Sequence, residues 1–201
     1  MEYDMLIDHL RTNDFILLTE LKTSLPFHMS GFQPIISPAM KSHRGGVAIM
    51  IKNKIFENIT NIDKSYENMV LFQTEFHPNI TFVLCYIAPD DSPYYDDAMF
   101  GQLHNILNEN KDNVFFVFGD LNARVATPDL TQVSPNLSYP HCTDDKTNYN
   151  GRQLLQVCKD NDMVIINNLK VENISFPSSL SYRKGKNWVS ELDYCLGSVG
   201  H

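Results

Sequence analysis

The sequence predicts an α/β protein in which two β-sheets pack on each other and helices flank them. Short apolar runs rich in β-branched and aromatic residues recur along the chain, which is typical of strands. Early runs follow one another as hairpins, whereas later runs alternate with amphipathic helical segments. The 201 residues suit one domain spanning 1–201, or one large piece of a domain.

Composition narrows the class of protein. The chain is 43% hydrophobic and 20% charged, as globular proteins are, and no apolar run approaches the length of a membrane span. The acidic start Met-Glu-Tyr-Asp-Met lacks the features of a signal peptide, so we expect an intracellular protein that is not secreted and does not enter a membrane. The four cysteines are widely spaced without a Cys-x-x-Cys pair, which favours reduced thiols, and Cys142 beside His141 lacks further metal ligands.

The formal net charge of −8 argues against a broad basic surface for nucleic acid. A local basic cleft remains compatible with it. Part of the acidic surplus also fits a metal site, because carboxylates hold hard cations such as Mg²⁺.

The first half of the chain predicts one helix and several strands. A short amphipathic helix is expected over Tyr3–Arg11, and residues 23–41 are expected to be irregular with at most one brief strand. The Gly45-Gly46 pair is explained by a turn before a strand. Strands are expected at Phe15–Leu18, which should be buried, and at Val47–Ile51, Ile55–Ile62, Met69–Phe76 and Ile80–Ile87, the last two as an antiparallel hairpin.

The second half predicts two helices around a central strand. Apolar spacing indicates a helix over Tyr94–Asn110, capped by Asp91 or Ser92, and another over Gly151–Asp160. A long polar loop from Arg124 to Asn150 is expected to touch substrate. Strands are expected at Val114–Phe118 and Met163–Ile166. The basic run Arg183–Lys186 is either a solvated loop or a nucleic-acid contact.

The stretch Val114–Arg124 carries the strongest chemical signal. Five apolar residues bounded by Gly119 predict a strand that lies mid-sheet and is buried on both faces. Asp120 and Asn122 follow, two positions apart, so in extended geometry both polar side chains leave the same face. Sheets place their sites at such strand ends, although Gly119-Asp120 is also explained by a simple turn.

Other polar groups also lie at the ends of apolar strands: Glu20, Tyr86 and Asp193. Each has an ordinary interpretation, because a strand-end carboxylate is often solvated and a strand-end Tyr is often a core side chain. Together with Asp120 and Asn122 they supply a carboxylate for a hard metal ion, a phenol and an amide for a phosphate oxygen, and a carboxylate to orient water. Phosphodiester hydrolysis needs all of these.

Six ordered blocks resemble the endonuclease/exonuclease/phosphatase family, with greatest similarity to the apurinic-type endonuclease domains of non-LTR (LINE-like) retrotransposons. The blocks cover nearly the whole chain, and Gly-Asp-Leu-Asn-Ala-Arg is the most specific. They read Leu-Leu-Thr-Glu, Gly-Gly-Val-Ala-Ile, Cys-Tyr-Ile-Ala-Pro, Phe-Gly-Asp-Leu-Asn-Ala-Arg, Asn-Tyr-Asn-Gly-Arg-Gln-Leu-Leu and Ser-Glu-Leu-Asp-Tyr-Cys-Leu.

The resemblance implies a DNase I-like fold, a two-sheet four-layer sandwich with flanking helices, and a role for each site residue. Glu20 is implied as the ligand of Mg²⁺, which Mn²⁺ could replace, and Tyr86 as a contact to the scissile phosphate. Asp120 is implied to align or activate the attacking water. Asp193 is implied to orient a catalytic histidine. Phosphate or substrate contacts are implied for Asn122, Ser181 and Arg124.

The family's first strand, with its Asn, and its closing Ser-Asp-His strand have no counterparts here, and His201 is not assigned as the catalytic histidine. We therefore expect an incomplete domain, with terminal strands missing and weak or no activity as given. The expected function is a DNA nickase, with DNA as partner, nuclear location and a reverse transcriptase region in the parent protein. The alternatives are a phosphatase acting on a small or lipid phosphoester and a non-catalytic binding remnant of the fold.

Overall fold

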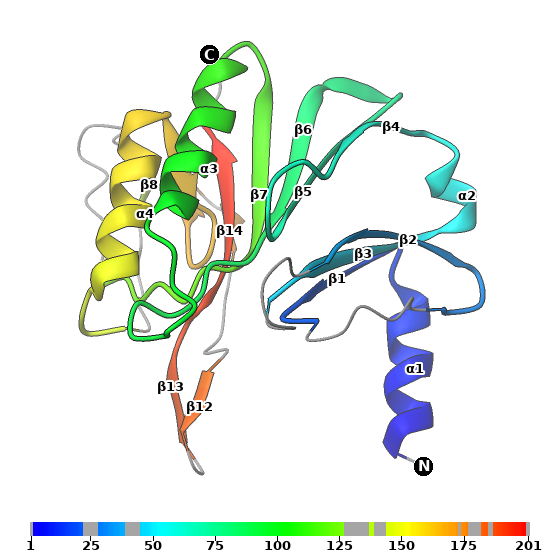
Figure 1. The fold of residues 1–201 in the computed structure, drawn as a ribbon, viewed down its shortest axis with the longest axis horizontal. Helices are drawn as coiled ribbons and strands as arrows, with labels where there is room; N and C mark the ends of the chain where they lie inside the picture. The colour runs from blue at the N-terminus through cyan, green and yellow to red at the C-terminus, as the bar shows by residue number, and fades with distance from the viewer. Residues whose placement is uncertain are drawn as a thin grey trace.

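The structure is a computed structural model that describes residues 2–21, 28–38, 45–126, 137–138, 144–172, 174–176, 182–184 and 187–199, with residues 2–6, 182–184 and 187–189 described by their backbone alone. Four layers make up the molecule (Figure 1): a helix pair, a six-stranded sheet, a three-stranded sheet and the N-terminal helix. The α/β prediction of two packed sheets with flanking helices is confirmed.

The large sheet has the strand order β4-β5-β6-β7-β14-β9. Only β6 and β7 run parallel, as a strand-helix-strand crossover requires, and their neighbours pair antiparallel. The strands are β4 (Ile59–Asp63), β5 (Met69–Thr74), β6 (His77–Cys85), β7 (Val114–Asp120), β14 (Asp193–Ser198) and β9 (Met163–Ile165). The crossover is α3 (Ala98–Glu109), which lies beside α4 (Tyr149–Asp160) on one face of the sheet.

The small sheet has the order β1-β3-β2 and lies on the opposite face of the large sheet (Figure 1). Its strands are β1 (Phe15–Thr19), β3 (Val47–Lys52) and β2 (Phe32–Ser37), with α1 (Glu2–Thr12) beyond it and α2 (Asn53–Phe56) leading out of it. Two small sheets complete the described elements. One has the order β11-β10-β8, with β8 (Leu137–Ser138), β10 (Lys170–Val171) and β11 (Ile174–Ser175), and the other is the hairpin of β12 (Tyr182–Lys184) and β13 (Asn187–Ser190). No described helix is long and apolar enough to cross a membrane.

Alternation along β6 and its exit distributes side chains between two cores. Val83 and Cys85 belong to the core under α3 and α4, whereas Leu84 and Tyr86 belong to the core between the sheets. Successive side chains in a strand point to opposite faces, so an unbroken apolar run is needed where both faces are covered. This is why Ile80–Ile87 lacks a polar face.

The small sheet repeats this pattern on a smaller scale. Residues Val47, Ile49 and Ile51 of β3 enter the core between the sheets. Met50 points the other way and packs with Ile16, Phe32 and the α1 residue Leu10 in a third core. The three cores therefore correspond to the three interfaces between four layers.

Strand β7 is central in the large sheet, as predicted, but the prediction that both faces are buried is wrong for one face. Phe115 and Val117 are buried toward the helices, with 3% and 0% of their surface exposed. Phe116 and Phe118 are only half-buried and stack on each other with ring centroids 6.4 Å apart. The three-stranded sheet is too narrow to cover the whole of this face.

Strand β1 also differs from its prediction, because it lies at the edge of the small sheet. It forms where expected, but it is an edge strand that pairs only with β3 among the described strands. Phe15 and Leu17 are 38% and 40% exposed, so the expected burial is wrong for them. An apolar run is equally compatible with an edge strand, and nothing within the run distinguishes the two positions.

Two further boundaries depart from prediction. The expected strand Ile55–Ile62 is a helical turn, α2, followed by β4, because the chain must pass there from one sheet to the other. The helix expected from Tyr94 begins only at Ala98, whose N–H is bound by the Asp96 carboxylate at 2.9 Å, and the cap predicted at Asp91 or Ser92 is wrong. The helices α1 and α4, the β5-β6 hairpin and strand β9 form as predicted.

Candidate active site

Four chain segments bring predicted site residues to one rim of the sandwich. Glu20 follows β1, Tyr86 follows β6, Asp120 ends β7 and Asp193 begins β14. The Tyr86 hydroxyl donates a hydrogen bond of 2.7 Å to Glu20 Oε1. This contact joins the two sheets, so the rim exists only when they are packed together.

Asp120 and Asp193 are directly opposite each other in the β7-β14 pairing. Two carboxylates in opposed positions repel when both are ionised. Burial, as the largest cause, and the charges of Asp193 and Glu20 raise the pKa of Asp120 to about 7, although the hydrogen bond from the Asn122 N–H offsets part of this. Asp120 is therefore poised to exchange a proton near neutral pH.

Asn122 is held beside Asp120 by its own backbone and side chain. Its N–H donates to Asp120 Oδ1 at 3.0 Å, and its Nδ2 donates to the carbonyl of Ile87 at 2.9 Å. Asn122 has φ of +46°, and Glu20 has φ of +52°. Non-glycine residues rarely adopt this left-handed region, and such strain clusters at functional sites.

The hydroxyl of Tyr86 stays protonated at this rim. Burial is the largest cause that raises its pKa, followed by the hydrogen bond to Glu20 and the charges of Glu20 and Asp120. A protonated phenol can donate a hydrogen bond to an oxygen that gains negative charge during a reaction.

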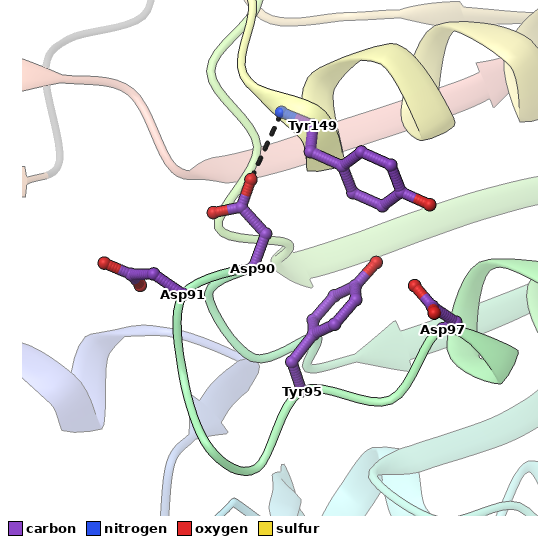
Figure 2. A pocket seen from close by; sticks show the side chains of 5 residues that line it. All are labelled: Asp90, Asp91, Tyr95, Asp97 and Tyr149. Carbon is purple, nitrogen blue, oxygen red and sulfur yellow. Dashed lines mark hydrogen bonds between the residues drawn. The ribbon is translucent and has the colours of Figure 1, made fainter.

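An open hollow of about 540 Å³ lies on the helix side of the rim (Figure 2). Burial and the charge of Asp97 raise the pKa of Tyr95 to about 12 there. Because three carboxylates gather in the hollow, it disfavours anionic groups. Its lining residues are Asp90, Asp91, Tyr95, Asp97 and Tyr149.

The profile of the endonuclease/exonuclease/phosphatase family matches residues 2–201. The chain belongs to this family. No curated protein matches the chain in a direct sequence search.

Two solved structures of similar fold show how distant the individual relatives are. The catalytic domain of Xenopus laevis APE2 is 14% identical with a TM-score of 0.61, over 96% of this chain and 77% of that one. ANGEL2, a 2′,3′-cyclic phosphatase in complex with adenosine-2′,3′-vanadate, is 11% identical with a TM-score of 0.50, over 98% of this chain and 74% of that one. At such identities the similarity shows a common DNase I-like fold and leaves the substrate open.

Family enzymes generally use divalent metal ions such as Mg²⁺. Glu20 and Asp120 offer the oxygen ligands that such hard cations prefer, and their mutual repulsion is what a cation would relieve. Within the described ranges, however, no three His, Cys, Asp or Glu side chains are grouped closely enough to hold a metal ion by themselves. Any ion here would keep several waters or substrate oxygens, which is common for Mg²⁺.

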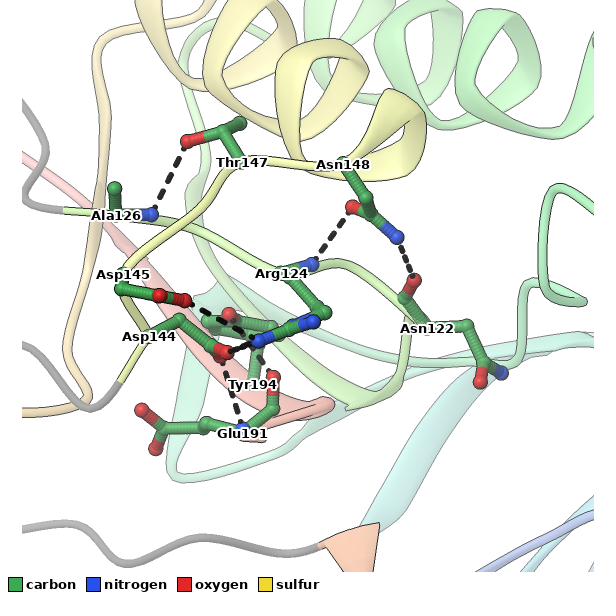
Figure 3. A network of polar contacts seen from close by, with 9 residues as sticks. All are labelled: Asn122, Arg124, Ala126, Asp144, Asp145, Thr147, Asn148, Glu191 and Tyr194. Atoms are coloured by element: carbon green, nitrogen blue, oxygen red, sulfur yellow. Dashed lines mark hydrogen bonds and ion pairs between the residues drawn. The ribbon is translucent and has the colours of Figure 1, made fainter. Parts of the chain in front are cut away.

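Arg124 has its guanidinium on the carboxylate of Asp144 (Figure 3). Nε and Nη2 lie 2.8 and 2.7 Å from Asp144 Oδ1, and Nη2 lies 3.6 Å from Asp145. The Asp144 side chain is only 1% exposed, so this ion pair holds the loop after β7. A substrate-binding role for Arg124 stays a prediction. Ser181 lies outside the described residues, as do Gly185 and Lys186.

Sequence reasoning missed several polar side chains that support the rim. Asn148 and Asn150, at the start of α4, bind backbone groups of the loops after β6 and β7. Glu191 is 4% exposed, and its N–H donates to Asp144 Oδ2 at 3.1 Å. Asn before a helix is a recognised cap signal, but the sequence does not say which other backbone groups the cap will bind.

Proposed function

We propose that the chain is a Mg²⁺-dependent phosphodiesterase that nicks DNA, of the type found in non-LTR retrotransposons. The observation that carries the proposal is the hydrogen bond between Tyr86 and Glu20 beside the opposed pair Asp120 and Asp193. It gathers metal-ligating, proton-accepting and phosphate-binding groups from both sheets at one rim. Family membership supports the reaction class, and the six ordered sequence blocks support the retrotransposon type.

Each group has a role that its environment suits. Asp120, with a pKa of about 7, accepts a proton from the attacking water. The second N–H of Asn122 Nδ2 donates to a phosphate oxygen, which gains charge as the water attacks. The single proton of the Tyr86 hydroxyl donates to Glu20, and it becomes available to a phosphate oxygen when the Glu20 carboxylate turns to a metal ion. Asp193 faces Asp120 across the β7-β14 pairing, and its negative charge helps to raise the pKa of Asp120.

Glu20 is the residue that would hold Mg²⁺, with the waters or phosphate oxygens that this ion retains. When bound, the ion supplies Lewis-acid polarisation of the phosphoryl group. The carboxylate is already oriented toward the centre by the Tyr86 hydroxyl.

The expected DNA path avoids the acidic hollow. The hairpin β12-β13 projects from the sandwich (Figure 1), and only two residues separate β13 from Asp193 at the start of β14. Its sequence includes Arg183 and Lys184, two basic residues in a chain with a net charge of −8, on a hairpin whose second strand leads into the catalytic rim. Positive charge in this place suits phosphates flanking the cut site.

Nicking of supercoiled plasmid in the presence of Mg²⁺ tests the proposal. Asp120→Ala is expected to reduce nicking by about 10²- to 10⁴-fold, the usual contribution of a general base. Asp112→Ala is the matched control, because Asp112 is an exposed carboxylate just before the opposite end of β7. Equal nicking by wild type and Asp120→Ala would refute the site assignment.

A phosphatase acting on a small phosphoester is the second candidate. The net charge of −8 favours it over a nuclease, because the repulsion of a substrate grows with the number of phosphates that it carries. Hydrolysis of bis-p-nitrophenyl phosphate or a soluble phosphomonoester, lost in Asp120→Ala and accompanied by no plasmid nicking, would support this candidate. Folded protein without activity on either substrate and without calorimetric Mg²⁺ binding would indicate a non-catalytic binding domain.

A further inference from the structure

The side chain of Asn148, the residue just before α4, binds the loop that follows β7. Asn148 Oδ1 accepts hydrogen bonds from the N–H groups of Gly151 and Arg124, both at 2.8 Å. Its Nδ2 donates to the carbonyl oxygen of Asn122 at 3.0 Å (Figure 3). The first contact caps the helix, and the other two reach the loop that follows β7.

Neighbouring groups add further contacts between the start of α4 and the loop after β7. The backbone N–H of Asn148 donates to the Arg124 carbonyl at 3.1 Å. A Cβ atom at Gly151 would lie 2.0 Å from that carbonyl oxygen, so only glycine permits the helix to approach so closely. Asn150, fully buried, donates to the carbonyls of Leu121 and Ala88 at 3.1 and 3.0 Å.

Asn122 is thereby fixed at three polar points. Its N–H is bound by Asp120, its Nδ2 by Ile87, and its carbonyl by Asn148. The left-handed backbone at Asn122 is costly by itself and persists only where the surroundings determine it. Asp120 and Ile87 lie at the ends of β7 and β6, whereas Asn148 lies at the start of α4.

We propose that Asn148 is a positioning residue that acts through Asn122: by fixing the backbone of Asn122, it places the carboxamide of that residue beside Asp120 for phosphate binding. This inference rests on the proposed function, because it assigns Asn122 to phosphate binding. A carboxamide is required because it offers an acceptor for two N–H groups and a donor for one carbonyl from the same short side chain. Asp keeps the acceptor oxygen and loses the N–H donor to the Asn122 carbonyl. Ser can still cap the helix, but its shorter side chain does not reach the loop after β7.

The test compares Asn148→Asp and Asn148→Ser with wild type, using Mg²⁺-dependent nicking and thermal unfolding. Both variants keep a favourable helix cap, so Tm is expected to stay within about 3 °C of wild type. The kcat of Asn148→Asp is expected to fall about 10- to 100-fold, because displacement of a reacting group by about 1 Å costs this much. A fall in kcat that occurs only with a matching fall in Tm would overturn the proposal.

A double-mutant cycle with Asn122→Ala separates positioning from general support. If Asn148 acts through Asn122, Asn148→Asp should reduce kcat by less than about 3-fold in the Asn122→Ala background. The same loss of about 10- to 100-fold in both backgrounds would show that Asn148 does not act through Asn122.

Amide hydrogen exchange without substrate keeps this proposal distinct from the proposed function. Asn148→Asp is expected to speed exchange at the amide of Asn122, because the Asn122 carbonyl loses its donor, while the amide of Arg124 keeps its acceptor and the amides of α4 after its first turn stay unchanged. If wild type proves inactive on phosphoesters, the proposed function fails. Faster exchange at the Asn122 amide in Asn148→Asp would still support the positioning of this loop by Asn148. Unchanged exchange at the Asn122 amide would refute the positioning role of Asn148.

Discussion

Replacing Asp120 by Asn should change how the stability of the protein depends on pH. The pKa of Asp120 is raised from 3.8 to about 7, chiefly by burial and then by the neighbouring carboxylates. The folded state thus holds this proton more tightly than the unfolded chain. Its contribution to stability is fully present below about pH 4 and is lost as the pH rises through about 7.

The size of the effect follows from the pKa difference. About 3 pH units at about 1.4 kcal/mol each set an upper limit of about 4 kcal/mol. Solvent access at the rim reduces it, so the expected range is about 2 to 4 kcal/mol. The amide of the Asp120→Asn variant carries no such proton, so the free energy of unfolding of wild type should fall by this amount relative to the variant between about pH 4 and pH 7.

Urea unfolding of both proteins at intervals from about pH 4 to pH 8, with a chelator present, measures the difference. Asp14→Asn provides a control without a slope in this range, because the Lys52 hydrogen bond lowers the pKa of Asp14 and its contribution is lost only below about pH 4. Parallel stability curves for wild type and Asp120→Asn across this range would refute the reasoning. Saturating Mg²⁺ should reduce the difference above about pH 7 if the ion binds beside Asp120.

Three further substitutions test the fold and the rim. Gly119→Ala should destabilise the protein by about 3 kcal/mol or more, since φ is +148° and a Cβ would lie 1.7 Å from the Cys85 carbonyl oxygen; urea unfolding measures this. Tyr86→Phe removes the 2.7 Å bond to Glu20 and should lower kcat about 10-fold or more with little change in Tm. Leu17→Lys, at a site 40% exposed on an edge strand, should leave Tm unchanged, as measured by thermal unfolding.

Each of these three predictions has an outcome that would contradict it. Wild-type stability of Gly119→Ala would mean that β6 and β7 approach less closely than described. An unchanged kcat for Tyr86→Phe would remove the phenol from the reaction, and a marked loss of Tm for Leu17→Lys would mean that the edge of β1 is covered.

The central part of the site could be predicted because its signals are local. The apolar run before Gly119 marks a strand, and polar residues directly after a strand lie at a sheet rim whatever the rest of the fold. Asp120 and Asn122 follow this rule, as does Tyr86. The chemistry of these side chains then restricts the reactions that they can support.

The partners of these residues could not be predicted in the same way. Glu20 meets Tyr86 across 66 positions, and that contact depends on how two sheets pack. The run Phe15–Leu18 has the same composition whether it lies at the centre or at the edge of a sheet. Burial of Phe116 and Phe118 likewise depends on the width of a second sheet, which no local pattern encodes.

The asparagines at the start of α4 also determine when the site can exist during folding. Asn150 binds Ala88 across 62 positions and Leu121 across 29, and Asn148 binds Asn122 across 26. A folding intermediate that has formed β6 and β7 but has not docked α4 would contain Asp120 at the end of a strand and Asn122 in a loop without fixed geometry. Transient undocking of α4 in the native state would likewise release the loop after β7 while most of the sheet persists. The fraction of active molecules would then depend on the same equilibrium as the local opening of this helix.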